Sequence, residues 1–165
     1  KNVFRVADSQ VATRWGNIID FTNFDLITPN EKEARFSLAD QDSSMSLLMR
    51  ELVKKAKFKN LILKLGERGI VCSTTTNKEK KSSAFALPSF VTKVVDSTGT
   101  GDALLAYATL SMLSSKSLVI SSILGSLAAA CECEKDGNIT IKPEEILDKI
   151  NSIQDSSTYT ISKKA

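Results

Sequence analysis

A short turn of small residues, Asp96 to Asp102, is the feature that most constrains how this chain can fold. The two β-branched residues before it, Val94 and Val95, are typical of the end of a strand. A strongly apolar run begins at Ala103 and is typical of a buried helix. Two glycines within the turn let the backbone bend where a side chain would clash. The pattern therefore predicts a strand, a tight turn and a helix.

The start of this predicted helix is suited to bind an anion. The amides of Gly99, Thr100 and Gly101 lack helical partners, and the helix dipole adds positive potential there. A carboxylate that merely lined this site would repel a phosphate. Asp102 is better explained by a chemical role, such as accepting a proton from a substrate hydroxyl. In a purely structural interpretation, Asp96 caps the turn and Asp102 stabilises the helix dipole. The spacing alone leaves both interpretations open.

The same segment, D-S-T-G-T-G-D, resembles the D-T-x-G-A-G-D signature of the ribokinase-like carbohydrate kinases, the PfkB family. The two departures, Ser97 for Thr and Thr100 for Ala, keep the side chains small. The resemblance implies that Asp102 is the catalytic base and that the amides of residues 99–101 form the anion hole. It also implies a three-layer, Rossmann-like α/β sheet with flanking helices. The implied reaction is ATP-dependent phosphoryl transfer to a hydroxyl of a sugar or sugar phosphate.

A second candidate site lies at a predicted helix start. Thr28 or Asn30 can cap this helix, which has acidic residues in its first turn and is expected to run to about Leu38. Asn30 and Glu33 are three residues apart, so both lie on one side of that turn and could act together on a hydrated cation. They match the N-x-x-E motif of the family, which implies that they organise Mg²⁺ through water.

The apolar run Asn60–Leu65 predicts a buried parallel strand that ends in the turn G-E-R-G. This segment resembles the family's T-L-G-x-x-G, which implies that Lys64, Gly66 and Gly69 line the phosphates of the nucleotide. Taken alone, both glycines are simply turn residues. The resemblance adds two residues to the nucleotide site, Asp96 and Ser126, although Ser126 stands where the family often has an adenine-side Asn. It also implies that the loop at residues 136–138 could bind a monovalent cation, K⁺.

Asp8 follows the first predicted strand, Val3–Ala7. Open α/β sheets bind ligands at the carboxyl ends of their strands, so Asp8 could face a substrate, although an Asx turn explains it equally well. Hydrophobic periodicity predicts the remaining elements. They are a helix at Ser43–Lys57, strands at Ile70–Cys72 and Ala84–Leu87, helices at Gly101–Leu113 and Ser117–Glu134, and a last helix from Pro143 to about Ile153.

Composition excludes several functional classes. The chain has 165 residues and no histidine, so Ser-His-Asp hydrolysis, His general bases and His-based zinc sites are excluded within it. Three cysteines without metal-ligand spacing fit a reducing compartment, which predicts a cytoplasmic protein. A net charge of +3, with lysines on solvated faces, predicts neither nucleic-acid nor membrane partners. The sequence has no G-x-G-x-x-G after the first strand, which argues against a Rossmann dinucleotide-binding domain. It also has no G-K-S/T, which argues against a P-loop NTPase.

The resemblance runs from about Val3 to about Ile153 but covers only the C-terminal half of such a kinase. We therefore expect residues 1–154 to be its nucleotide-binding and catalytic portion, inactive in isolation, and residues 155–165 to be a frayed tail. The expected partner is a second copy of the chain or the missing N-terminal half. The segment Val6–Gln10 and the helix start at Thr28–Asn30 resemble the heptose-phosphate-type sugar kinases, some of which are fused to nucleotidyltransferases. The alternative is a nucleotide-binding or regulatory module without catalysis.

Overall fold

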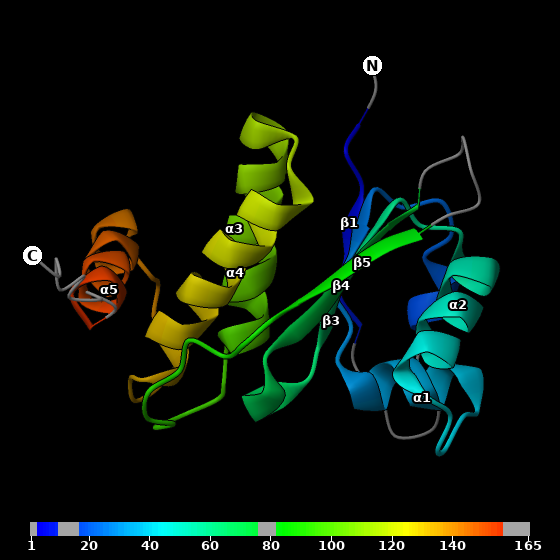
Figure 1. Cartoon of the computed structure of the whole chain (residues 1–165), viewed down its shortest axis with the longest axis horizontal. Coiled ribbons are helices and arrows are strands. Elements are labelled where there is room, and N and C mark those ends of the chain that lie inside the picture. Colours follow the sequence, from blue (N-terminus) through cyan, green and yellow to red (C-terminus); the bar gives the residue numbers. More distant parts are fainter. Residues whose placement is uncertain (1–2, 10–16, 76–81, 157–165) are drawn as a thin grey trace, which may run out of the picture.

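The computed structural model describes residues 3–9, 17–75 and 82–156, which form a five-stranded sheet between two layers of helices (Figure 1). Neighbours in the chain are neighbours in the sheet. The first three strands are parallel, and the last two run antiparallel to the strands beside them. This architecture confirms the predicted α/β class with flanking helices. The strands are β1 (Val6–Ala7), β2 (Leu26–Ile27), β3 (Asn60–Lys64), β4 (Ile70–Thr75) and β5 (Ser82–Leu87).

The central strand, β3, is buried on both faces. Leu61, Ile62 and Leu63 have no exposed surface, as the uninterrupted apolar run predicts for a parallel strand covered by helices. A short 3₁₀ turn, η2 (Gly66–Arg68), then reverses the chain into β4. The parallel strands therefore end on one edge of the sheet, where the turn after β3 also lies.

One face of the sheet is covered by η1 (Ile18–Asp20), α1 (Glu31–Leu38) and α2 (Met45–Ala56). The apolar stripe of α2, including Leu48 and Leu52, packs with Phe58 and the sheet in a continuous core. Ser44 caps the start of α2 through a bond from the Leu47 amide. Both predicted helices on this face are confirmed, within two residues at each end.

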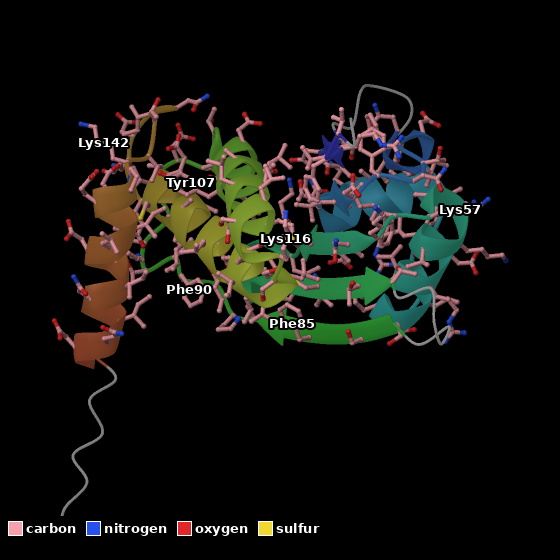
Figure 2. The ribbon with its side chains drawn as sticks, turned by 90° about the horizontal axis from the view of Figure 1, so that it is seen from above. Lys57, Phe85, Phe90, Tyr107, Lys116 and Lys142 are labelled. Atoms are coloured by element: carbon pink, nitrogen blue, oxygen red, sulfur yellow. The ribbon has the colours of Figure 1, made fainter. Side chains whose placement is uncertain are left out.

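The other face is covered by α3 (Thr100–Ser115) and α4 (Leu118–Cys133), and α5 (Pro143–Ser156) packs outside α4. Figure 2 shows Phe90 and Tyr107 in the region between this pair of helices and α5. The Tyr107 hydroxyl donates a 2.7 Å hydrogen bond to the carbonyl of Ile141, just before α5 begins. The C-terminal helix thus packs on the helical layer.

Several expectations are corrected. The strands β1 and β2 are only two residues long, and β1 pairs only through the last two residues of the expected strand Val3–Ala7. The helix α3 was predicted to be buried all round, but Leu110 is 64% exposed and Leu113 is also exposed. No described element covers that side of α3. Trp15 and residues 76–81, between β4 and β5, lie outside the described residues.

Among the described residues, no helix is both long and apolar enough to cross a membrane. The cysteines Cys72, Cys131 and Cys133 are all free and buried. They contribute to packing, and α4 carries two of them on its inner side.

Candidate functional site

The carboxyl ends of β1 and β3 meet the start of α3 at one edge of the sheet. Asp8 follows β1, Lys64 ends β3, and the ammonium of Lys64 lies 2.6 Å from Oδ2 of Asp8. A methyl group on Gly101 would lie 3.1 Å from Nζ of Lys64 and 3.3 Å from Oδ2 of Asp8. Three segments far apart in the sequence therefore converge where sheets of this kind bind ligands.

The first turn of α3 presents several backbone amides without a hydrogen-bond partner in the described part of the chain. Gly99 is the N-cap, with a φ of +81°, and no side chain caps the helix. Within the described residues, the amides of Gly99, Gly101 and Asp102 make no hydrogen bond, and that of Thr100 donates to the Ser97 carbonyl over a long 3.4 Å. Free amides and the helix dipole together make this turn suited to an anion.

The carboxylate of Asp102 is exposed beside these amides and makes no ion pair or hydrogen bond with any described residue. Asp96, in contrast, closes the preceding turn, because its Oδ1 accepts a 2.9 Å hydrogen bond from the Thr98 amide. The Thr98 backbone and side chain lower the pKa of Asp96. The structural role considered for Asp96 is thus observed, and Asp102 is left accessible to a ligand.

Asp8 does not face a cleft as a free carboxylate. Its Oδ1 accepts a 2.9 Å hydrogen bond from the Ser9 amide, and its Oδ2 holds Lys64. The bond from the adjacent amide is not the two-residue contact of an Asx turn, and the ion pair with Lys64 holds Asp8 at the carboxyl end of β1. The pairing of Asp8 with Lys64 spans 56 residues of sequence, and no local pattern could have revealed it.

Asn30 and Glu33 form a reciprocal capping box at the start of α1. Oδ1 of Asn30 accepts from the Glu33 amide at 2.8 Å, and Oε2 of Glu33 accepts from the Asn30 amide at 2.7 Å. Glu33 is only 7% exposed, and burial raises its pKa. The bond from Asn30 and the charge of Lys64 act in the opposite direction, whereas the charge of Asp8 raises the pKa further.

This arrangement fits a hydrated cation better than a directly ligated one. The described residues contain no group of three or more carboxylate or cysteine side chains placed to hold a metal ion. The capping box uses Oε2 of Glu33, and the carboxylate is close to the charges of Asp8 and Lys64. Oxygen donors of this kind suit Mg²⁺, which keeps several of its waters in protein sites.

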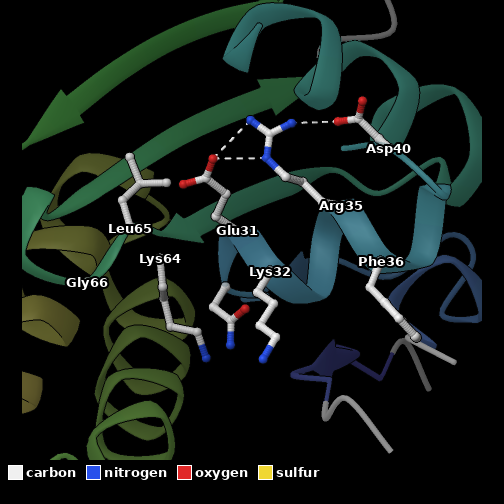
Figure 3. Close-up of a pocket in the computed structure, with 9 residues that line it drawn as sticks. Glu31, Lys32, Arg35, Phe36, Asp40, Lys64, Leu65 and Gly66 are labelled. Atoms are coloured by element: carbon white, nitrogen blue, oxygen red, sulfur yellow. Dashed lines mark hydrogen bonds and ion pairs between the residues drawn. The ribbon is translucent and has the colours of Figure 1, made fainter. Parts of the chain in front are cut away.

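A cleft of about 570 Å³ opens beside this cluster, between the start of α1 and the turn after β3. Figure 3 shows the ammonium groups of Lys32 and Lys64 pointing to the same side, away from the ion pairs of Arg35 with Glu31 and Asp40. Lys32 was not among the predicted site residues, although it lies inside the N-x-x-E segment. Gly66 lines this cleft together with Asn30.

The other predicted nucleotide residues lie in different surroundings. At Gly69, φ is +84° and a methyl group would lie 2.1 Å from the carbonyl oxygen of Leu87, so a glycine is needed for β5 to approach. Ser126 is buried in α4, and its hydroxyl has no hydrogen-bond partner among the described residues. Neither residue is part of the cluster formed by Asp8 and Lys64.

Glu132 is a candidate residue that the sequence analysis missed. It is 1% exposed on α4, and its Oε1 accepts a 2.9 Å hydrogen bond from the Ile139 amide. A methyl group on Gly99 would lie 2.8 Å from that oxygen and 2.4 Å from Oδ1 of Asn138. Oε2 of Glu132 is buried without a partner among the described residues. A buried carboxylate thus supports the turn that opens α3.

Comparison with known families and proteins finds several matches. The profile described as "pfkB family carbohydrate kinase" matches residues 15–145. The chain is 29% identical over 142 residues to the bifunctional protein HldE of Vibrio parahaemolyticus, covering 85% of this chain and 29% of that protein. The chain thus spans under a third of that curated relative.

Solved structures show the same fold. Phosphofructokinase-2 from Escherichia coli, in complex with potassium, has a TM-score of 0.72 at 18% identity, over 90% of this chain and 47% of that one. Ribokinase from Arabidopsis thaliana, complexed with ribose and ATP, has a TM-score of 0.68 at 20% identity, over 88% of this chain and 46% of that one. The match of the family profile to most of the chain decides the assignment: the chain belongs to the pfkB family of carbohydrate kinases.

Proposed function

We propose that this chain carries the nucleotide-binding and catalytic portion of a kinase that transfers a phosphoryl group from ATP to a hydroxyl of a sugar or sugar phosphate. The observation that supports this most strongly is the exposed, unpaired Asp102 beside the free amides of Gly99 and Gly101. Because a carboxylate next to an anion site weakens anion binding, its presence there is best explained by proton transfer.

Asp102 would accept the proton of the acceptor hydroxyl while that oxygen attacks the γ-phosphorus of ATP. The bond from the γ-phosphorus to the bridging oxygen then breaks, and ADP leaves with the electron pair. The amides at the start of α3 would stabilise the negative charge on the transferring group, since they are already oriented before the reaction. Lys64, beside Gly101, would add a positive charge at the same point.

Mg²⁺ would neutralise phosphate charge when it is bound with the nucleotide. Asn30 and Glu33 would hold it through water, because Oδ1 of Asn30 and Oε2 of Glu33 already serve the capping box. Gly66 and Lys32 border the cleft that opens beside this pair and would lie near the phosphates. The roles proposed for Gly69 and Asp96 are to shape the two turns, and that of Ser126 is to lie near the adenine.

A monovalent cation such as K⁺ would fit beneath the α3 turn. Oε2 of Glu132 is buried without a partner in the described part of the chain. Oδ1 of Asn138 and Oε1 of Glu132 both lie close to Gly99. An unpaired buried carboxylate is costly, so a cation of low charge is a reasonable counter-ion there. We expect K⁺ to raise the melting temperature, and Glu132→Gln to remove that response.

The proposed acceptor is a sugar phosphate, and the proposed partner would cover exposed apolar surface. The resemblance of residues 6–10 and 28–30 to the heptose-phosphate-type sugar kinases favours a heptose phosphate or a related sugar phosphate as acceptor. The parallel edge strand β1 and the exposed Leu110 and Leu113 of α3 would then be covered by a second copy of the chain or by the other half of the kinase fold. The three free cysteines suit a reducing, cytoplasmic setting.

The test is Asp102→Asn in the kinase that contains this chain, assayed for turnover and for MgATP affinity. We expect turnover to fall about 10²–10⁴-fold, because a general base contributes about that much, with little change in affinity. The matched control is Asp42→Asn, which changes an exposed carboxylate remote from α3 and should leave turnover unchanged. Undiminished turnover in Asp102→Asn would remove that residue from its role. MgATP binding with no turnover in the unaltered protein would favour a regulatory module.

A further inference from the structure

The Lys64–Asp8 pair lies at the N-terminal end of α3 and is more buried than an ordinary surface ion pair. The Lys64 side chain is 18% exposed and that of Asp8 is 21% exposed, and the two charged atoms are 2.6 Å apart. Gly101 supplies the space, since a methyl group there would come within 3.1 Å of Nζ. The ammonium is therefore fixed beside the amides proposed to bind phosphate.

The Lys64 ammonium is held in place but keeps unused hydrogen-bond donors. An ammonium has three N–H donors, and among the described residues Nζ makes one hydrogen bond, to Oδ2 of Asp8. A free lysine side chain loses considerable rotamer entropy when it is immobilised by a ligand. A lysine that is already anchored loses less, so its remaining donors can bind an anion at lower entropic cost.

We propose that Asp8 is a positioning residue that acts through Lys64: it holds the ammonium at the start of α3 so that the phosphoryl-binding turn carries a fixed positive charge. This inference rests on the proposed function of the same turn. Asp8 itself is negative and would repel a phosphate, so positioning and repulsion have opposite effects on affinity. The sign of the effect therefore separates the two accounts.

The experiment measures binding of inorganic tripolyphosphate to this chain by calorimetry, in buffer with EDTA so that no metal ion contributes. We expect Asp8→Asn to weaken binding about tenfold, since a charge-assisted bond that fixes Lys64 is lost. In a Lys64→Met background, the same Asp8→Asn change should no longer weaken binding, because Asp8 then has nothing to position. The matched control is Asp25→Asn, which alters an equally short pair at the opposite edge of the sheet and should leave binding unchanged.

A second variant separates position from charge. Lys64→Arg keeps the positive charge but moves it to a longer, planar group, so binding should fall by about threefold or more. Thermal melts of each variant check that the chain is folded. Unchanged or tighter binding in Asp8→Asn, or equal weakening with and without Lys64, would overturn the positioning role. No binding by the unaltered chain would instead overturn the phosphate site itself, and with it the proposed function.

Discussion

Two ion pairs of equal length lie at opposite ends of the three parallel strands, and only one of them is placed to meet a ligand. Lys64 and Asp8 are at the carboxyl ends of β3 and β1, and Lys59 and Asp25 are at the amino ends of β3 and β2. Both pairs have an N–O distance of 2.6 Å. The Lys59 side chain is 70% exposed, whereas that of Lys64 is 18% exposed.

The difference is in what surrounds each pair. At the amino edge, Asp25 also accepts a hydrogen bond from the Arg5 amide, so the pair joins strands and has a structural role. At the carboxyl edge, Gly101, Glu33 and the free amides of α3 lie around the pair. Ion-pair geometry alone therefore says little about function. The polarity of the strands, which brings the helix N-terminus to one edge, distinguishes the two pairs.

Reversing the charge of each lysine should separate the two edges most strongly. We expect Lys64→Glu to weaken MgATP binding on the order of 100-fold, because it adds a third carboxylate beside Asp8 and Glu33. The same reversal at the amino edge, Lys59→Glu, should leave binding unchanged. Calorimetric titration with MgATP checks both variants. Equal losses at the two edges would mean that the carboxyl edge has no special relation to the nucleotide.

Part of this comparison could be predicted from the sequence. The tight turn at 96–102, the helix start at Asn30 and the buried strand at 60–64 arise from local patterns, which were sufficient to place them. The strand expected to end at Val94 and Val95 does not form, since both residues are exposed and lie outside any strand between β5 and α3. The pairing of Lys64 with Asp8 could not be predicted, because it depends on three segments brought together by sheet order.

The buried position of Glu132 was also missed, and for a related reason. The periodicity of α4 does not indicate that a carboxylate on it would lie under Gly99, some thirty residues earlier in the chain. The exposed side of α3 was missed because an apolar helix predicts a covering layer, whereas no described element covers Leu110. Local sequence thus predicts which elements form, and tertiary contacts decide which side chains meet.

Substitutions of the two glycines in the turn should change the stability of the fold by different amounts. We expect Gly99→Ala to destabilise the fold by about 1–3 kcal/mol, because φ is +81° and a methyl group would collide with Asn138 and Glu132. Gly101→Ala should not destabilise the fold comparably, since it lies within α3 and would contact only the flexible end of Lys64 and Asp8. Urea unfolding curves compare the two, and a larger loss in Gly101→Ala would contradict the geometry described for the turn.

The smallest predicted effect concerns stability at the amino edge. Burial acts to raise the pKa of Asp25, but the bonds from Arg5 and Lys59 outweigh it, and the pKa lies below its ordinary value of 3.8. The ionised form is therefore favoured in the folded state, and this stability is present above the ordinary pKa and is lost as pH falls through the lowered value. Asp25→Asn should cost about 1 kcal/mol near neutral pH and much less at about pH 2. Chemical unfolding at both pH values checks this, and a loss that does not depend on pH would refute it.

The most direct test of the central claim follows individual amides of this chain by ¹⁵N-resolved NMR while MgATP is added. If phosphate binds at the start of α3, the amides of Gly99, Gly101 and Asp102 should show the largest shifts, and those of Asp25 and Lys59 should show almost none. Saturable binding with the largest shifts at the amino edge, or with no shift at the α3 turn, would contradict the account.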